Sequence, residues 1–312
     1  MSKNLLSWSL LILVSFIWGS SFILMKRGMT ALDGTPIFSH TQVAALRMVI
    51  ASTALLPFTI MAFKKIKNFK KFLLFLIIGM TANFLPALLF TYAENEVSSG
   101  FAGMLNSFTP IFTVIISVMF FSQKMTPIQV FGTFVAITGS VLLMFSGYNI
   151  TFAGSWSHIL AIVLATLFYG VSMNLIKFKL SDFKAMEVTA LCYGSFIVPA
   201  YFVLFASGTH EVIQSSPKAM EGLFFISILA LVGTAFSGVI FNKLIANSTT
   251  IFSSSVTYFI PIVAVFIGFL VGEDINMNQV GSMLIIIIGV FTVNYFSNKR
   301  EINFIKMLKK SR

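Results

Sequence analysis

Long apolar stretches separated by short polar segments run along the whole chain. Each stretch has about 20 residues, the length that a helix needs to cross the hydrocarbon core of a bilayer. Runs such as Phe72–Ile78 and Leu284–Ile288 do not alternate in polarity, whereas transmembrane β-strands do. The pattern therefore predicts an all-α integral membrane protein with ten spans, at residues 6–25, 42–61, 72–92, 98–120, 128–147, 157–176, 186–206, 220–241, 248–271 and 278–296.

The composition supports burial in lipid. Only 10% of the 312 residues are charged, whereas soluble proteins have about 25%, so the chain cannot cover a soluble surface. The lone Cys192 cannot form an intramolecular disulfide. The net charge of +11 is spread over short loops and a tail rather than one face, so the expected partner is the lipid bilayer and not nucleic acid.

The basic residues predict an orientation. If the N-terminus is cytoplasmic, the inner segments hold 17 of the 21 Lys and Arg residues, and the outer segments hold Lys26, Arg27 and Lys218. The remaining one, Arg47, lies within the second span. Because cytoplasmic loops carry the excess of positive charge, both termini are predicted to be cytoplasmic in a cell (inner) membrane.

The chain resembles itself at an offset of 151 residues, which falls to 150 near the end of each half. Each half holds five spans. Because five is odd, the second half enters the membrane from the opposite side, an inverted repeat typical of secondary transporters. The predicted domains are a first repeat at 1–150, a second at 151–297 and a basic tail at 298–312. The matching positions are Trp18-Gly19 with Tyr169-Gly170, Phe90 with Phe241, Pro110 with Pro261, and Gly139 with Gly289.

Several motifs, in this order, resemble EamA-like repeats of the drug/metabolite transporter superfamily. The resemblance covers nearly the whole chain and implies ten spans, two repeats and export of amino acids or other small metabolites. One position departs, because Ser122-Gln123 stands where a Gly-Glu pair is expected, which argues against a carboxylate role at that turn. The motifs are Trp18–Phe22 with Lys26, Leu46-Arg47, Asn106–Pro110 with Gly132 and Gly139, and then Tyr258–Pro261, Gly272-Glu273, Gly281 and Gly289.

Polar residues inside the spans are the candidate substrate-binding groups, because such residues are costly in lipid and usually face the bundle interior. Hydroxyls and amides both donate and accept hydrogen bonds, which suits a neutral or zwitterionic solute. The alternative is that each forms an interhelical hydrogen bond. The candidates are Trp18 with Tyr169, Ser21 with Ser172, Asn83 with Thr234, Asn106 with Thr257, Asn242 with Thr91, and Tyr258 near the midplane.

Gating is assigned to a second group of positions. The rings of Trp18 and Tyr169 are expected to line and gate the cavity, or else to pack against neighbouring helices. Pro110 and Pro261 each remove a backbone donor, which predicts a shared bend that is either a hinge or a fixed kink. Arg47 lies near the outer end of its span, where it either snorkels to the interface or serves an outer gate.

The expected function is transport of a small-molecule substrate, most simply efflux of amino acids or metabolites. The chain has no P-loop, and His40, His158 and His210 lack the spacing of metal ligands, so no cofactor or metal is expected. The first alternative is a nucleotide-sugar or phosphorylated-metabolite carrier of the same superfamily, which needs several cations in the cavity. The second, less favoured, is an intramembrane enzyme, which needs an acid–base pair at membrane depth. No Asp or Glu lies mid-span, which leaves both uncoupled efflux and antiport open, and the sequence also leaves a homodimer open.

Overall fold

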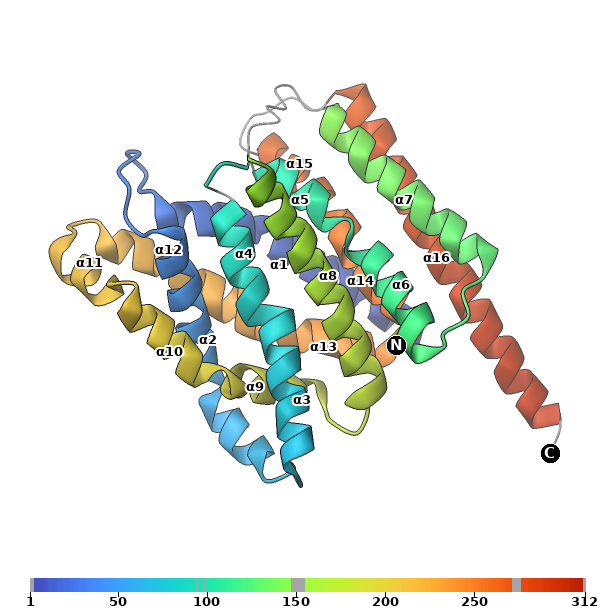
Figure 1. Ribbon diagram of the computed structural model, residues 1–312. Coiled ribbons are helices and arrows are strands. Elements are labelled where there is room, and N and C mark those ends of the chain that lie inside the picture. The colour runs from blue at the N-terminus through green and yellow to red at the C-terminus, as the bar shows by residue number, and fades with distance from the viewer. Residues whose placement is uncertain (1–2, 94, 98, 147–154, 271–275, 311–312) are drawn as a thin grey trace.

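The computed structural model of the protein describes residues 3–93, 95–97, 99–146, 155–270 and 276–310 (Figure 1). Regular structure in these ranges is helical, because in lipid a helix satisfies its own backbone hydrogen bonds. The elements are α1 (Lys3–Met29), α2 (His40–Phe63), α3 (Phe69–Gly79), η1 (Met80–Phe84), α4 (Leu85–Ala93), α5 (Ser99–Asn106), α6 (Thr109–Phe121), α7 (Pro127–Phe145), α8 (Trp156–Lys179), α9 (Ala185–Ser195), α10 (Ile197–Ala206), α11 (Thr209–Ser215), α12 (Ala219–Ala230), η2 (Leu231–Phe236), α13 (Ser237–Asn247), α14 (Thr250–Ser254), α15 (Val256–Leu270) and α16 (Met277–Lys310).

Each span predicted from the sequence coincides with one helix or with successive helical segments. Among the described residues, six helices are long and apolar enough to cross a membrane, and the pair α9–α10, bent by 43°, makes a seventh. The helices α6 and α7 and the first part of α16 are shorter apolar helices. The all-α membrane fold is thereby confirmed, whereas the total of ten spans stays a prediction.

Some predicted features lie outside the described residues. These are the repeat boundary at 150–151, the Gly272-Glu273 motif and the span ends at 98, 147 and 271. The helix α16 runs from Met277 to Lys310 and so crosses the predicted start of the tail at 298, and the division into two repeats and a tail stays a prediction.

Side chains cap the N-termini of several helices. The hydroxyl of Ser39 accepts from the backbone N–H of Gln42, and the Gln42 side chain accepts in return from the Ser39 backbone N–H. Asn68 accepts from Lys71 at the start of α3, and Thr249 accepts from Phe252 at the start of α14. Such caps satisfy backbone donors that have no partner within the helix.

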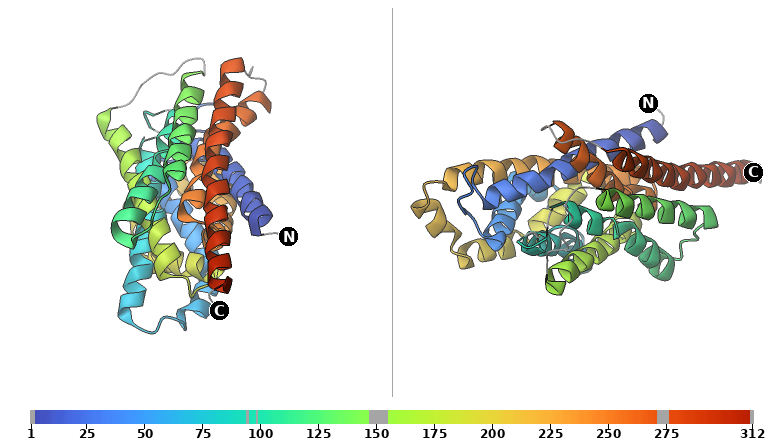
Figure 2. Two further views of the ribbon diagram at one scale, coloured as in Figure 1. Left: turned by 90° about the vertical axis from the view of Figure 1, so that its right-hand side faces the viewer. Right: turned by 90° about the horizontal axis from the view of Figure 1, so that it is seen from above.

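The two repeats pack through equivalent helices. The second span α2 packs against its counterpart α9–α10, and the fifth span α7 packs along its counterpart α16. The first helix of each repeat packs into the other repeat, α1 against α12, α13 and α15, and α8 against α4 and α6. Figure 2 shows from above that α10–α11 and α7–α16 lie at opposite ends of the molecule, and in Figure 1 α1 and α8 run in opposite senses. This exchange is what a pseudo-twofold axis between inverted repeats produces.

Glycines allow the close approach at equivalent points. A Cβ added to Gly19 would lie 2.7 Å from the Cβ of Val263, and one added to Gly170 would lie 2.9 Å from the carbonyl carbon of Phe112. Gly19 and Gly170 differ by 151 positions, and so do Phe112 and Val263. The repeat offset found in the sequence therefore also relates two contacts between the halves. Both contacts require glycine, because any larger residue would keep the helices apart.

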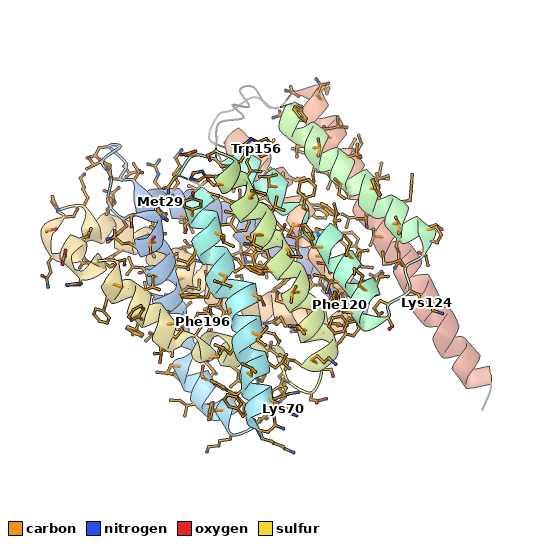
Figure 3. All side chains as sticks on the ribbon, in the orientation of Figure 1. Met29, Lys70, Phe120, Lys124, Trp156 and Phe196 are labelled. Atoms are coloured by element: carbon orange, nitrogen blue, oxygen red, sulfur yellow. The ribbon has the colours of Figure 1, made fainter. Side chains whose placement is uncertain are left out.

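Labelled residues mark the two ends of the bundle. Lys70 and Lys124 lie toward one end, and Met29 and Trp156 toward the other (Figure 3). At the outer segments Lys218 lies 2.9 Å from Asp33, and its ammonium group holds the pKa of that carboxyl well below its usual range. The ends of helices that were predicted to share a side of the membrane thus lie together.

We predict that Gly289→Val destabilises the protein. A Cβ at Gly289 would lie 2.7 Å from the carbonyl oxygen of Gly132 and meet the backbone of Ala136, so α7 and α16 must separate, at a cost of about 1–3 kcal/mol. Thermal unfolding in detergent should show a lower melting temperature. The matched control is Gly281→Val on the same helix, where nothing lies within 4 Å of an added Cβ. Equal melting temperatures for the two variants would contradict the close packing.

Candidate functional site

A cavity lies between the two repeats. It encloses about 1160 Å³ of space, part of it open solvent, and is lined by residues from both repeats. Nine of the eleven residues that the sequence analysis named as candidates for substrate binding lie along it. They are Trp18, Ser21, Asn83, Asn106, Tyr169, Ser172, Thr234, Asn242 and Thr257.

The other two candidates, Tyr258 and Thr91, do not line the cavity. The Tyr258 side chain is 1% exposed and packs in a core cluster beside Phe252, and its hydroxyl has no hydrogen-bond partner among the described residues. Thr91, nominated as the counterpart of Asn242, is buried and donates to the carbonyl of Ala87 in its own helix. The polar candidates therefore all face the interior of the bundle, but some line the cavity and others lie in the packed core.

The polar pair Asn83 and Thr234 lies in two π-helical segments at equivalent positions. The segment η1 spans Met80–Phe84 and η2 spans Leu231–Phe236, so their starts differ by 151 residues. The Thr234 hydroxyl donates to the carbonyl of Leu229, five residues earlier, over 2.9 Å. A π-helical turn widens the backbone locally and is often found at functional sites. Hydrophobic periodicity carries no signal for it, so the sequence did not reveal these segments.

Each π-segment is bonded by the second span of the other repeat. Arg47 on α2 donates from Nε to the Thr234 hydroxyl over 2.6 Å, and Tyr193 on α9 donates from its hydroxyl to Oδ1 of Asn83 over 2.6 Å. Arg47 therefore lies along the cavity rather than at the outer interface to which snorkelling would bring it. Its long side chain extends from the helix toward the cavity. The position of Arg47 within its span does not by itself predict this direction.

The aromatic residues at the cavity form equivalent pairs across the repeats. Trp18 lies 4.7 Å from Phe241 between ring centroids, and Tyr169 stacks on Phe90 at 6.1 Å. Phe90 and Phe241 again differ by 151 positions. The Trp18 indole N–H donates to the Ser237 hydroxyl over 2.9 Å. Each ring nominated for gating is thus held by the third span of the other repeat.

The fourth span of each repeat is broken beside the cavity. The break between α5 and α6 follows Asn106, whose Oδ1 accepts from the Thr109 hydroxyl over 3.1 Å. The break between α14 and α15 lies at Ser255, just before Thr257. Pro110 lies in the first turn of α6, and Pro261 lies inside α15, and neither lines the cavity. The prolines thus follow the breaks, and a hinge role for them stays a prediction.

Sequence reasoning missed some of the polar lining. Tyr193, Thr189 and Ser237 all line the cavity, and Thr189 accepts from the Asn242 amide over 2.8 Å. Thr189 and Ser237 escaped the repeat test because Phe38 and Pro86 stand opposite them at the offset of 151, whereas Tyr193 was missed although the polar Gln42 stands opposite it. The described residues contain no group of three His, Cys, Asp or Glu side chains that could hold a metal ion.

Comparison with known proteins gives a family. The sequence profile of the EamA-like transporter family matches twice, at residues 6–145 and 156–295. A relative in Bacillus subtilis, the uncharacterized transporter YoaV, is 24% identical over 94% of this chain and 98% of its own length. The probable terminal-alkyne amino-acid exporter of Streptantibioticus cattleyicolor is 23% identical over 84% of each chain.

A further relative and a solved structure extend the comparison. Protein PagO of Salmonella typhimurium is 24% identical over 90% of each chain. A crystal structure superposes with a TM-score of 0.69 at 14% identity, over 96% of this chain and 99% of the other. At that identity the crystal structure supports the fold alone.

We predict that the cavity admits water-soluble reagents. Because Cys192 is the single cysteine, a Cys192→Ser background allows one thiol to be placed at a time. Ser21→Cys and Thr257→Cys should react readily with a small methanethiosulfonate reagent, since both positions line the cavity. Ser140→Cys is the matched control, because Ser140 is 0% exposed and lies outside the lining. Equal reaction rates at the three positions, followed by mass spectrometry, would refute the assignment.

Proposed function

The chain belongs to the EamA-like transporter family, and on this premise we propose that it exports amino acids or other small metabolites by alternating access. It is a multi-pass membrane transporter of the drug/metabolite superfamily and not an enzyme, as its family and transporter-named relatives indicate. The single observation that carries the proposal is the cavity between the repeats, to which equivalent residues of both repeats contribute.

The proposed mechanism follows from the inverted symmetry. Two repeats of opposite orientation can exchange conformations. The second repeat then adopts the conformation that the first repeat had, and the first adopts that of the second. The opening then moves from one face of the membrane to the other. The segments η1 and η2 are the bending points that we assign to this exchange, because each interrupts a span beside the cavity and is bonded to the other repeat.

The substrate class is supported by the lining. Amides and hydroxyls such as Asn83, Asn106 and Thr257 alternate with the rings of Trp18, Phe90 and Phe241. This mixture suits a small solute with a polar head and an apolar remainder. The printed name of the Streptantibioticus relative, an amino-acid exporter, supports the same class. A nucleotide-sugar would need several cationic side chains, and the described lining holds one, Arg47.

We further propose an inner-membrane location with both termini in the cytoplasm. The support is the bias of 17 inner to 3 outer basic residues. A homodimer stays a prediction. The glycines Gly132, Gly139 and Gly289 do not support one, because they pack α7 against α16 within one chain.

We predict that Trp18→Ala and Tyr169→Ala lower saturable counterflow of labelled amino acids in proteoliposomes. Each variant removes an aromatic pair worth about 0.5–1.5 kcal/mol at the cavity, so a roughly two- to tenfold loss is expected. Counterflow needs no imposed ion gradient and so tests carriage itself. Trp156→Ala is the control, because that ring is 79% exposed at the start of α8.

Two results would count against the proposal. Wild-type rates in both cavity variants would remove the rings from the transport path. No exchange of any amino acid by the wild-type protein would remove amino acids as the substrate class and leave the family assignment standing.

A further inference from the structure

The cavity contains one charged side chain among its described lining residues. That residue is Arg47, and no Asp, Glu, Lys or His stands among the other lining residues. The described ion pairs of the chain lie elsewhere, between Lys65 and Glu187, around Lys218, and between a histidine and a glutamate at His158 and at His210. Arginine keeps its charge in proteins, so the centre of the cavity carries a fixed positive charge without a protein counter-charge among the described residues.

Most of the N–H donors of the Arg47 guanidinium make no hydrogen bond to the described residues. Of its five N–H groups, the one on Nε is used by the Thr234 hydroxyl, which fixes the plane of the group. The described hydrogen bonds include none from the two terminal nitrogens. These present the planar fork that binds a carboxylate with two parallel hydrogen bonds. Thr234 thus orients the arginine and leaves its carboxylate-binding edge available.

Neighbouring polar groups complete a small anion-binding surface. The Tyr193 hydroxyl donates to Oδ1 of Asn83, which leaves the amide N–H groups of Asn83 for another acceptor. Asn83 and Arg47 both line the cavity, so both offer hydrogen-bond donors to a ligand bound there.

The rest of the lining is apolar. Rings of Trp18, Phe22, Phe90 and Phe241 and the side chain of Met48 cover much of the wall. A charge left without a partner in such surroundings is costly, and a bound anion offsets that cost. A lone organic cation would meet repulsion from Arg47 and find no carboxylate among the described lining residues. The cavity therefore favours one negative group joined to an apolar body.

We propose that Arg47 is the carboxylate-binding residue of the cavity. The carrier accordingly selects monocarboxylates with an apolar remainder, zwitterionic amino acids among them, over organic cations. This inference rests on the proposed function and deepens it by naming the chemical group that is recognised.

The test measures binding separately from transport. Ligand-induced shifts of the melting temperature in detergent are recorded for 3-phenylpropionate, phenylalanine, phenylalaninamide and 2-phenylethylamine, with leucine and leucinamide as an aliphatic pair. The acids should bind the wild-type protein, and the amides and the amine should bind at least about tenfold more weakly, because the charge-assisted hydrogen bonds are lost. This comparison needs no variant, so it stands even if a substitution impairs folding.

Variants then assign the effect to Arg47. Arg47→Gln should bind acid and amide alike, and Arg47→Lys should restore part of the preference for the acid. Counterflow of the same solutes completes the experiment. An acid preference in the wild-type protein without counterflow would support the site and count against the carrier. Counterflow with equal use of acid and amide would overturn the role of Arg47 and leave the carrier standing. Absence of binding by every acid would also overturn the inference.

Discussion

The first helix of each repeat packs against the other repeat at a glycine, and the position of the cavity depends on that contact. Gly19 lies against Val263, and Gly170 lies against Phe112. The residues just before them, Trp18 and Tyr169, are thereby placed along the cavity, against Phe241 and Phe90. In lipid the hydrophobic effect does not drive helices together, so close packing at small residues has to hold the halves in register.

The polar contacts between the repeats follow the same symmetry with different chemistry. Both π-segments carry a polar side chain, and both receive a hydrogen bond from the second span of the other repeat. The donor is arginine in one case and tyrosine in the other. The backbone arrangement is thus nearly twofold, whereas the charge is not, since Val198 stands at the position equivalent to Arg47. The two repeats thus have similar backbone arrangements, whereas the arginine that we propose for recognition is present in the first repeat alone.

Arg47 is the residue at which the proposed function weighs most against stability. An arginine at membrane depth is costly, and such residues commonly mark the pathway of a substrate or ion, which agrees with the role that we propose for Arg47. The hydrogen bond to Thr234, which is the one that Arg47 donates among the described residues, orients the guanidinium without neutralising it. The cavity therefore combines an oriented charge with a wall of aromatic rings, and this combination is what a carrier of small amphipathic acids requires.

The sequence by itself determined the helical membrane fold, the two repeats and most of the polar residues of the cavity lining. Apolar length fixes the spans, because a helix must cover the hydrocarbon core. The offset of 151 selected polar pairs such as Asn83 with Thr234, because symmetry brings equivalent positions to one axis. The tertiary structure decided the rest. Successive residues on a helix point about 100° apart, so Thr257 faces the cavity while Tyr258 enters the packed core. The hydropathy of a span does not indicate which way a residue points, where the π-segments lie or that Arg47 extends toward the cavity. All three depend on which helices surround a residue rather than on the composition of its own span.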